Sequence, residues 1–304
     1  MKNSLIVRIA EGLGNQLFMY ANAISLSNKI NYDLYVDNES GYFKKKDIRN
    51  FELDKFNLSA PIVDDKFKFN NHIKNLRRKF LIRYDLFRNK KKFILENKYE
   101  NKKTRFEEIR TDNLSEIIYI EGNYESEKYF EMNRSLILEE FKIKNNDQLK
   151  KNNYYDLITK NKDRVISICV RANRYSERIK NKTNQYSKIK SDEFTKNNID
   201  YIYRAIKNLP KKIENPIYLL WSNDFHNLEE YFPNDQFIFV RNKDDKIITD
   251  FYLLTLCKNF IVAPTSFHWW GAWLSQEYDK LCIKPKNINQ SSNIDFWPEK
   301  WISL

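Results

Sequence analysis

Two hydroxyl side chains lie where a strand is expected to give way to a helix. An apolar run at 260–263 is ended by a proline, and Thr265 and Ser266 then precede a tryptophan-rich stretch at 269–278. A hydroxyl in this place caps the first backbone N–H groups of a helix, and the same groups can bind a phosphate. Capping is the commoner use, with the tryptophans in the core. A phosphate site at Thr265, Ser266 and Phe267 is the alternative.

Two arginines follow the strand expected at 165–170. Arg171 comes directly after the strand and Arg174 lies three residues further on. A guanidinium group can clamp a diphosphate through paired hydrogen bonds, so either arginine could hold one. Each taken alone is most simply a surface arginine.

The next expected strand, at 217–221, also ends in polar residues. Three side chains that can bind sugar or ribose hydroxyl groups come directly after it: Ser222, Asn223 and Asp224. Ligands of parallel sheets bind at the carboxyl ends of the strands, so all of these side chains are expected at one edge. The second half of the chain therefore predicts a pocket for a nucleotide diphosphate.

The elements that would position this pocket alternate regularly. Strands are expected at 165–170, 217–221, 237–240, 260–263 and 281–284, and helices at 192–208, 225–232, 247–257 and 269–278. Such alternation predicts a parallel sheet with helices on both faces, and hence an α/β fold. The polar stretch at 142–163 predicts a domain junction, which gives domains at 1–145 and 146–304.

A glycine-containing turn lies near the N-terminus. It separates a strand expected at 4–10 from a helix expected at 17–28, and a second strand follows at 32–36, which makes a βαβ unit. Gly12 and Gly14 would let the backbone approach a ligand, or would only allow a tight turn. The third glycine of a dinucleotide fingerprint is missing.

Composition narrows the class of protein. The 304 residues carry a formal charge of +12 and 15% aromatic side chains, which fits a folded chain with a sizeable core. A basic chain suits a phosphorylated substrate or an anionic membrane surface. Nucleic-acid binding is a further alternative, but the charge is spread along the chain and no nucleic-acid motif is present.

The spacing of the cysteines predicts free thiols in a reducing compartment. Cys169, Cys257 and Cys282 lie in apolar runs without paired spacing, and the three histidines are scattered, so no metal site is predicted. No apolar run is long enough for a signal peptide or a membrane span. We expect a cytoplasmic protein, at most peripheral on the inner face of a membrane.

Four segments together resemble one enzyme family. Residues 12–18 (GLGNQLF) are similar to the N-terminal signature of family 11 glycosyltransferases, the bacterial α-1,2-fucosyltransferases. Residues 51–53 and 126–130 resemble its next two segments. Residues 265–274 (TSFHWWGAWL) closely match its C-terminal signature. The matches stand in the right order and span nearly the whole chain.

The resemblance implies a GT-B-like fold, with two Rossmann-like domains facing a central cleft. It implies an inverting, metal-independent transfer of L-fucose from GDP-fucose to a 2-hydroxyl group, usually of a galactose, with no cofactor. The GDP-sugar donor is expected in the C-terminal domain. The saccharide acceptor, free or lipid-linked, is expected towards the N-terminal one. Nucleic acid is not an expected partner.

The residues and the resemblance together assign roles. Arg171 matches an arginine that contacts the donor diphosphate in the wider superfamily. Glu11, which departs from the family pattern, is the candidate group for acting on the acceptor hydroxyl. These two are the expected catalytic residues. The expected donor-binding residues are Gly14, Asn15, Gln16, Arg171, Arg174, Ser222, Asn223, Asp224, Thr265, Ser266 and Phe267.

Two departures from the family pattern keep alternatives open. The family motif His-x-Arg-Arg-x-Asp reads here as residues 169–174, CVRANR, so Arg174 replaces the acidic residue and only the first arginine is kept. Glu11 stands where the family often has glycine. A transferase for another GDP-sugar or linkage, or a non-catalytic homologue that only binds the sugar nucleotide, are the alternatives.

Overall fold

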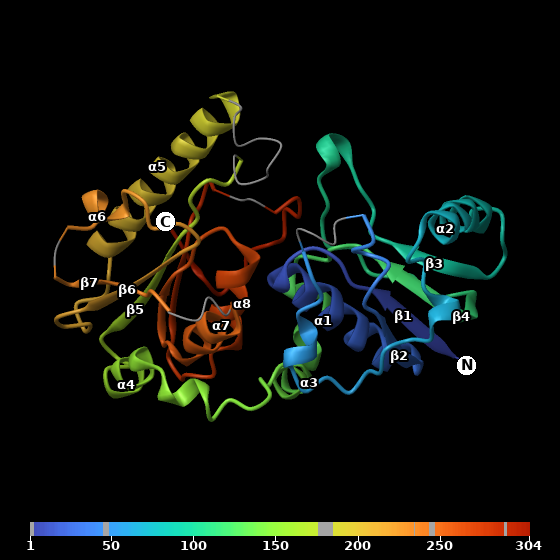
Figure 1. Cartoon of the computed structure of the whole chain (residues 1–304), viewed down its shortest axis with the longest axis horizontal. Coiled ribbons are helices and arrows are strands. Elements are labelled where there is room, and N and C mark those ends of the chain that lie inside the picture. The colour runs from blue at the N-terminus through green and yellow to red at the C-terminus, as the bar shows by residue number, and fades with distance from the viewer. Residues whose placement is uncertain (1–2, 45–48, 176–184, 234, 243–246, 289–290) are drawn as a thin grey trace. The chain divides into compact units, whose positions relative to one another are not determined.

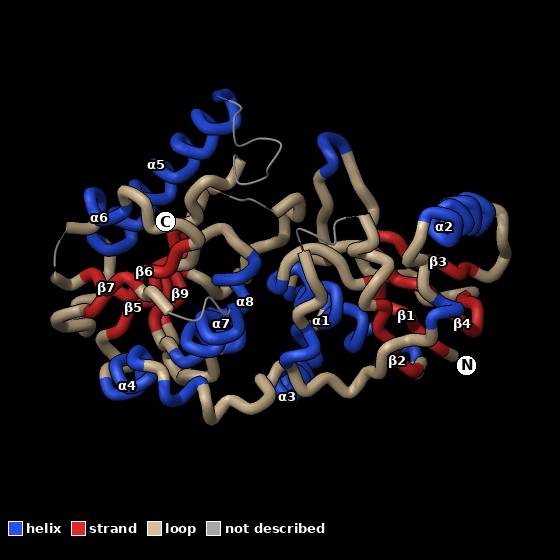
Figure 2. Tube along the Cα trace, viewed as in Figure 1, coloured by secondary structure: helices blue, strands red, loops and turns tan. Residues whose placement is uncertain are grey.

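The chain folds into two compact units. The computed structural model describes residues 3–44, 49–175, 185–233, 235–242, 247–288 and 291–304 (Figure 1). The first unit contains Met1–Lys144 together with Ser291–Pro298, and the second contains Asn145–Gln290 together with Glu299–Leu304. Both are α/β units with parallel sheets flanked by helices (Figure 2), as the sequence predicts.

The first unit is built on a four-stranded parallel sheet in the order β2-β1-β4-β3. The strands of the first unit are β1 (Ser4–Arg8), β2 (Asp33–Asp37), β3 (Lys91–Leu95) and β4 (Leu114–Glu121), and its helices are α1 (Leu13–Ile30), α2 (His72–Asp85) and α3 (Arg134–Glu140). The expected βαβ unit at the N-terminus is confirmed as β1, α1 and β2.

Helix α1 is the central helix of this unit. Almost its whole length is buried, including the Phe18 and Tyr20 side chains. The Tyr20 hydroxyl donates to Glu140 Oε2 at 2.6 Å, and the same carboxylate accepts from the Ser59 backbone N–H at 2.8 Å. A buried carboxylate is tolerated here because its oxygens accept hydrogen bonds. Asn31, in the left-handed conformation, ends the helix.

The segment Ser291–Pro298 completes the first unit, although the sequence pattern places it in the second domain. Asn293 forms a β-bridge with Thr104, and Asp295 Oδ2 accepts from the Phe106 backbone N–H at 2.9 Å. The buried Phe296 ring lies 6.1 Å from the Phe18 ring on α1. A late part of the sequence thus contributes core residues to the N-terminal unit.

The second unit contains a six-stranded parallel sheet in the order β10-β9-β8-β5-β6-β7. Its elements are α4 (Asn153–Lys160), β5 (Val165–Val170), α5 (Gln185–Lys207), β6 (Ile217–Ser222), α6 (Leu228–Tyr231), β7 (Phe237–Phe239), α7 (Ile247–Leu256), β8 (Asn259–Ile261), α8 (Ser266–Leu274), β9 (Leu281–Lys284) and β10 (Ile302–Ser303). The expected alternation of strands and helices is confirmed.

The tryptophans of α8 belong to the core, as expected. Trp269 and Trp270 are fully buried and Trp273 nearly so. The Trp269 and Trp273 rings stack at 6.1 Å with an interplanar angle of 10°. At Gly271 an added Cβ would lie 2.9 Å from Leu254 Cβ of α7, so glycine allows the two helices to approach closely.

Some local structure has no counterpart in the sequence pattern. Residues 127–140 form two 3-10 turns, Glu127–Tyr129 and Glu131–Asn133, followed by α3. The polar stretch at 142–163 contains the 3-10 turn Leu149–Lys151 and α4, whose Ile158 is buried. Strand β3 begins with two lysines, which hid its pattern. Further 3-10 turns are Leu53–Lys55, Asp65–Phe67 and Glu100–Lys102.

Candidate active site

The start of α8 lies at the carboxyl edge of the second sheet. Thr265 is the N-cap, and its hydroxyl accepts from the His268 backbone N–H at 3.2 Å. Thr265 therefore caps the helix. Thr265, Ser266 and Phe267 are half-buried, in contrast to the tryptophans after them. This edge presents a helix N-terminus where an anion is favoured.

A fully buried histidine fixes that helix start. His268 Nδ1 accepts from the Ala263 backbone N–H at 3.1 Å, and Nε2 lies 2.9 Å from the Ser167 hydroxyl of β5. Since a backbone N–H can only donate, Nδ1 carries no proton, and the proton of the neutral ring is on Nε2. Burial lowers the pKa of His268 to about 3. No sequence pattern indicates this role, because an isolated histidine has no spacing to interpret.

The loop after β5 is tied to the loop after β6. The Asn223 side chain accepts from the Ala172 backbone N–H at 3.0 Å and donates to the Ala172 carbonyl at 3.1 Å. The Asn173 amide hydrogen-bonds the Asp224 carboxylate. These contacts fix the backbone on the C-terminal side of Arg171, so the two predicted site segments are adjacent. Arg171 and Arg174 are both half-buried in this loop.

The side chains after β6 have local partners. The Ser222 hydroxyl donates to the Asp224 carbonyl at 2.6 Å, and Asp224 Oδ1 accepts from the His226 backbone N–H at 3.0 Å. With Asn223 engaged at Ala172, the polar groups of this turn mainly shape the loops. Their expected part in donor binding stays a prediction.

The glycine turn before α1 differs in detail from its expected geometry. Gly12 is the N-cap with φ of −88°, and Gly14 is a buried helical residue. The left-handed position of the turn is Glu11, with φ of 62°. A residue with a Cβ is strained there, which explains why glycine would fit this position. The half-buried Asn15 lies in the first turn of α1.

The Gln16 side chain hydrogen-bonds the backbone of two neighbouring loops, a role that the sequence did not indicate. Its side-chain nitrogen donates to the carbonyl groups of Glu11 at 3.0 Å and Asn50 at 2.8 Å, and its oxygen accepts from the Glu52 N–H at 2.9 Å. The residue is fully buried. Its amide therefore holds the glycine turn and the 50–52 loop together, and the geometry favours this role over direct donor contact.

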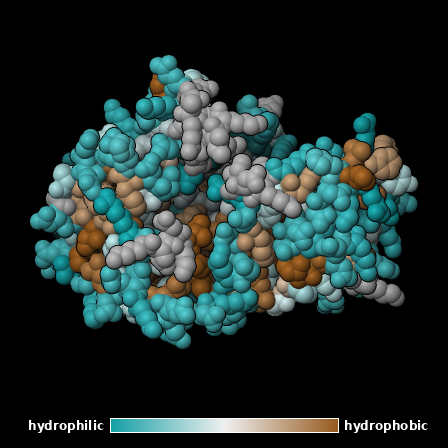
Figure 3. Space-filling view, in the orientation of Figure 1, coloured by the Kyte–Doolittle hydropathy of each residue, from teal (hydrophilic) through white to brown (hydrophobic). Residues whose placement is uncertain are grey.

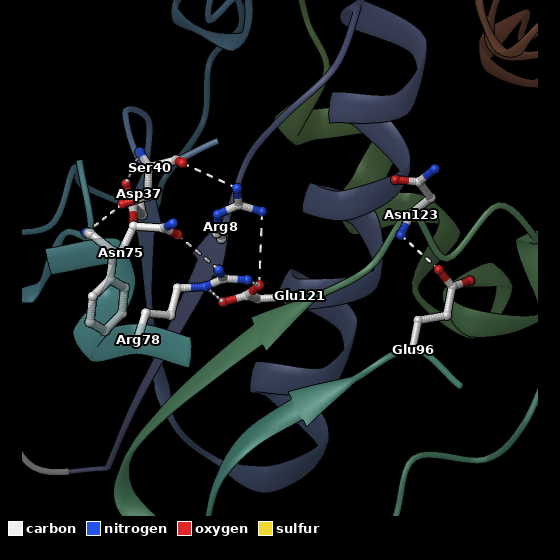
Figure 4. Close-up of polar contacts among 9 residues, drawn as sticks. Arg8, Asp37, Ser40, Asn75, Arg78, Glu96, Glu121 and Asn123 are labelled. Carbon is white, nitrogen blue, oxygen red and sulfur yellow. Dashed lines mark hydrogen bonds and ion pairs between the residues drawn. The ribbon is translucent and has the colours of Figure 1, made fainter. Parts of the chain in front are cut away.

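Charged residues gather where the strands of the first sheet end (Figure 4). Arg8 ends β1 and Glu121 ends β4, with Arg8 Nη1 3.8 Å from Glu121 Oε2. Arg78 of α2 also pairs with Glu121, through Nε and Oε1 at 2.6 Å. Arg8 Nη2 donates to the Ser40 carbonyl at 3.1 Å, and burial lowers the pKa of Arg8.

Three buried polar atoms near this edge lack partners among the described residues. They are Arg8 Nε, Asp37 Oδ2 and the Tyr42 hydroxyl. On the other side of β4, Glu96 accepts from the Asn123 N–H at 2.8 Å and the Tyr124 N–H at 3.1 Å, and burial raises its pKa (Figure 4). Polar atoms of this kind suit recognition of ligand hydroxyl groups. The sequence did not single out Arg8, Asp37 or Glu121.

Among the described residues, no group of three His, Cys, Asp or Glu side chains is placed to hold a metal ion. No described helix has the length and apolar character needed to cross a bilayer. Metal independence stays a prediction.

We predict that His268 makes stability depend on pH. The pKa of the His268 side chain is about 6.5 in the unfolded chain and about 3 in the folded chain. Between these two pH values, His268 binds a proton in the unfolded state but not in the folded state. The contribution of His268 to the free energy of unfolding should fall by about 1.4 kcal/mol per pH unit. His268→Asn, which keeps an acceptor for Ala263, should remove this dependence in urea unfolding between pH 7.5 and 5.5.

The exposed His226 provides the matched control. His226→Asn should leave the pH dependence of the wild type intact, because the His226 side chain is exposed and the buried His268 contacts are unchanged. If His268→Asn and the wild type lose equal stability over that pH range, the buried neutral imidazole is refuted.

The chain is similar in sequence to two glycosyltransferases of Escherichia coli. Over 97% of its length it is 26% identical to the Escherichia coli O-antigen biosynthesis glycosyltransferase WbnK, covering 99% of that protein. It is also 26% identical to an Escherichia coli alpha-1,2-colitosyltransferase, over 99% of this chain and 98% of that protein.

Solved structures agree on the fold. The fucosyltransferase NodZ from Bradyrhizobium matches with a TM-score of 0.53 at 15% identity, over 89% of this chain and 92% of NodZ. A NodZ alpha-1,6-fucosyltransferase soaked with GDP-fucose matches with a TM-score of 0.51 at 14% identity, over 90% of this chain and 93% of that one. The expected GT-B-like fold is confirmed. The model of glycosyl transferase family 11 matches residues 4–302, and the chain belongs to this family.

Proposed function

We propose that the chain moves L-fucose from GDP-fucose to the 2-hydroxyl of a sugar, preferably galactose, in a surface polysaccharide. The transfer inverts the anomeric centre and needs no metal. Family membership supports glycosyl transfer, and a solved neighbour was soaked with GDP-fucose. The relative named for O-antigen biosynthesis supports a polysaccharide product.

One observation carries this proposal. Arg171 and the start of α8 follow β5 and β8, which are adjacent strands with Ile168 paired to Ile261. The Arg171 guanidinium and the N-terminus of α8 therefore follow neighbouring strands at the same edge of the sheet. Both stabilise the negative charge that develops on a departing GDP, without a metal. In the reaction, the acceptor 2-oxygen forms the new bond as the bond to the GDP oxygen breaks, and a carboxylate takes the acceptor proton. We assign that carboxylate to Glu11.

A second candidate is transfer of another sugar. Arg174 stands where the family has an acidic residue, and one relative is named an alpha-1,2-colitosyltransferase. An acidic side chain can accept hydrogen bonds from donor-sugar hydroxyl groups, whereas an arginine can only donate. This change favours a donor sugar with a different hydroxyl pattern.

The test is a donor panel on the purified chain with excess EDTA. GDP-fucose, GDP-mannose and GDP-heptose are each incubated with a soluble galactoside, and the product linkage is read by NMR. We expect GDP-fucose to give an α-1,2-linked product with EDTA present. Turnover that requires added Mg²⁺ or Mn²⁺ would contradict the metal-free proposal. Preference for another donor would favour the second candidate, and donor binding without turnover would indicate a non-catalytic homologue.

Arg171→Ala should lower kcat/KM by about 10²–10³-fold, as removal of a group that stabilises transition-state charge does. Initial rates of fucosyl transfer measure this. Arg164→Ala is the matched control, because Arg164 precedes the same strand at its opposite end and donates to the Asn215 carbonyl. Equal rates for Arg171→Ala and Arg164→Ala would remove Arg171 from the reaction.

Glu11 can be tested by separating its charge from its backbone strain. Glu11→Gly should raise the free energy of unfolding by about 1 kcal/mol, since it removes the Cβ at φ of 62°. Glu11→Gln keeps the strain and removes the charge, so stability should stay unchanged. Both variants should lose at least about 10²-fold in turnover if the carboxylate is the base. Wild-type turnover in Glu11→Gln would refute that role.

A further inference from the structure

The outer face of α2 is unusually apolar for a solvent-facing helix surface. Among the described residues nineteen large apolar side chains are exposed, and six of them lie between residues 73 and 87. Four follow helical spacing on one stripe, and two more lie in the turn after the helix. They are Ile73, Leu76, Phe80 and Tyr84, then Leu86 and Phe87. Figure 3 shows hydrophobic side chains gathered over α2.

The exposed stripe is not the face of α2 that packs on the sheet, because other side chains of the helix form that face. Leu81 and Ile82 pack against the core cluster around Phe93 and Tyr119. Arg78 pairs with Glu121 on the same side. The buried Asp85 accepts from the backbone N–H groups of Lys92 and Phe93, at 2.9 and 3.0 Å, and so fixes the end of the helix. The helix is thus held to the sheet while its other side remains exposed.

The surroundings of the stripe are strongly basic. Residues 72–92 contain nine Lys and Arg and one acidic residue, Asp85, so this segment alone carries a formal +8, against +12 for the whole chain. The expectation that the charge is spread along the chain is therefore wrong for this segment. Arg77 and Arg83 are exposed on the two sides of the stripe, and Lys79 lies beyond Arg83. Concentrated exposed apolar area with a charged rim marks an interaction site.

We propose that the outer face of α2, with the turn after it, docks on an anionic lipid surface. Helices with an apolar stripe and a basic rim lie in the interface plane of a bilayer. The apolar side chains enter the acyl boundary, while Arg and Lys extend along it to the headgroups. This docking goes beyond the proposed reaction and does not depend on it.

The chemistry of the stripe favours lipid over nucleic acid. Aromatic rings could stack on bases, but Ile73, Leu76 and Leu86 have no such use, whereas all six side chains gain from entering an acyl phase. The clustered positive charge is complementary to acidic headgroups. Each basic residue near such a surface strengthens binding about fivefold at moderate salt.

The test is flotation of the full chain with phosphatidylcholine vesicles, with and without phosphatidylglycerol. We expect flotation with the anionic vesicles only, and its loss in high salt, where the Debye length shortens to about 3 Å. Phe80→Ser combined with Phe87→Ser, and separately Arg77→Glu combined with Arg83→Glu, should each weaken anionic-vesicle binding more than tenfold.

Matched controls use equally exposed side chains elsewhere. Met132→Ser with Tyr278→Ser controls for the apolar pair, since these side chains are 91% and 86% exposed, and Lys211→Glu with Lys212→Glu controls for the charge reversal. Neither control pair should change flotation. Sugar transfer to a soluble acceptor should be the same in all four variants, which shows that they fold.

The outcomes separate docking from catalysis. No flotation of the wild type, equal flotation with neutral vesicles, or equal weakening by the control pairs would each overturn the docking surface. In those cases normal transfer would leave the proposed reaction standing. Conversely, flotation that depends on α2 in a chain without transferase activity would refute the reaction and keep the surface.

Discussion

The neutral imidazole of His268 is the contact on which the geometry of the second unit's polar edge depends. One ring nitrogen accepts from the Ala263 backbone and the other faces the Ser167 hydroxyl, so the ring joins β5, the end of β8 and the start of α8. A charged ring would turn an N–H towards the Ala263 N–H, so the contact tolerates only one protonation state. The position of Thr265 and Ser266 relative to β5 follows from this constraint.

Within each of the two units, several polar side chains of types that often bind ligands instead hydrogen-bond the backbone. Asn223 brackets the Ala172 peptide, Thr265 caps α8, and Gln16 links three carbonyl and N–H groups in the first unit. Such groups hold neighbouring side chains to fixed directions. An active site needs this support, since small errors of position cost large factors in rate.

Regular elements could be predicted from the sequence because their signals are local. Residues 165–170 and 281–284 were predicted as strands with the bounds that the structure shows, since continuous apolar runs are typical of buried parallel strands. The convergence of the loops after β5, β6 and β8 followed from topology alone. Strand β3 was missed because its first two residues are lysines, which mask its short apolar run.

The polar edge of the first unit could not be predicted. Arg8, Asp37 and Glu121 end three strands that are far apart in the sequence, and only the register of the sheet brings them to one edge. The role of His268 was equally hidden, because it depends on Ser167, a hundred residues earlier. Pairings over such distances leave no local pattern in a single sequence.

The return of Ser291–Pro298 to the first unit has a consequence for the order of events during synthesis. Phe296 packs on α1, and Asp295 binds the Phe106 backbone, yet both residues are synthesised only after strands β5 to β9 of the second unit. N-terminal domains generally fold while the rest of the chain is still being made. Here the core of the N-terminal unit cannot be completed until the ribosome has passed Pro298.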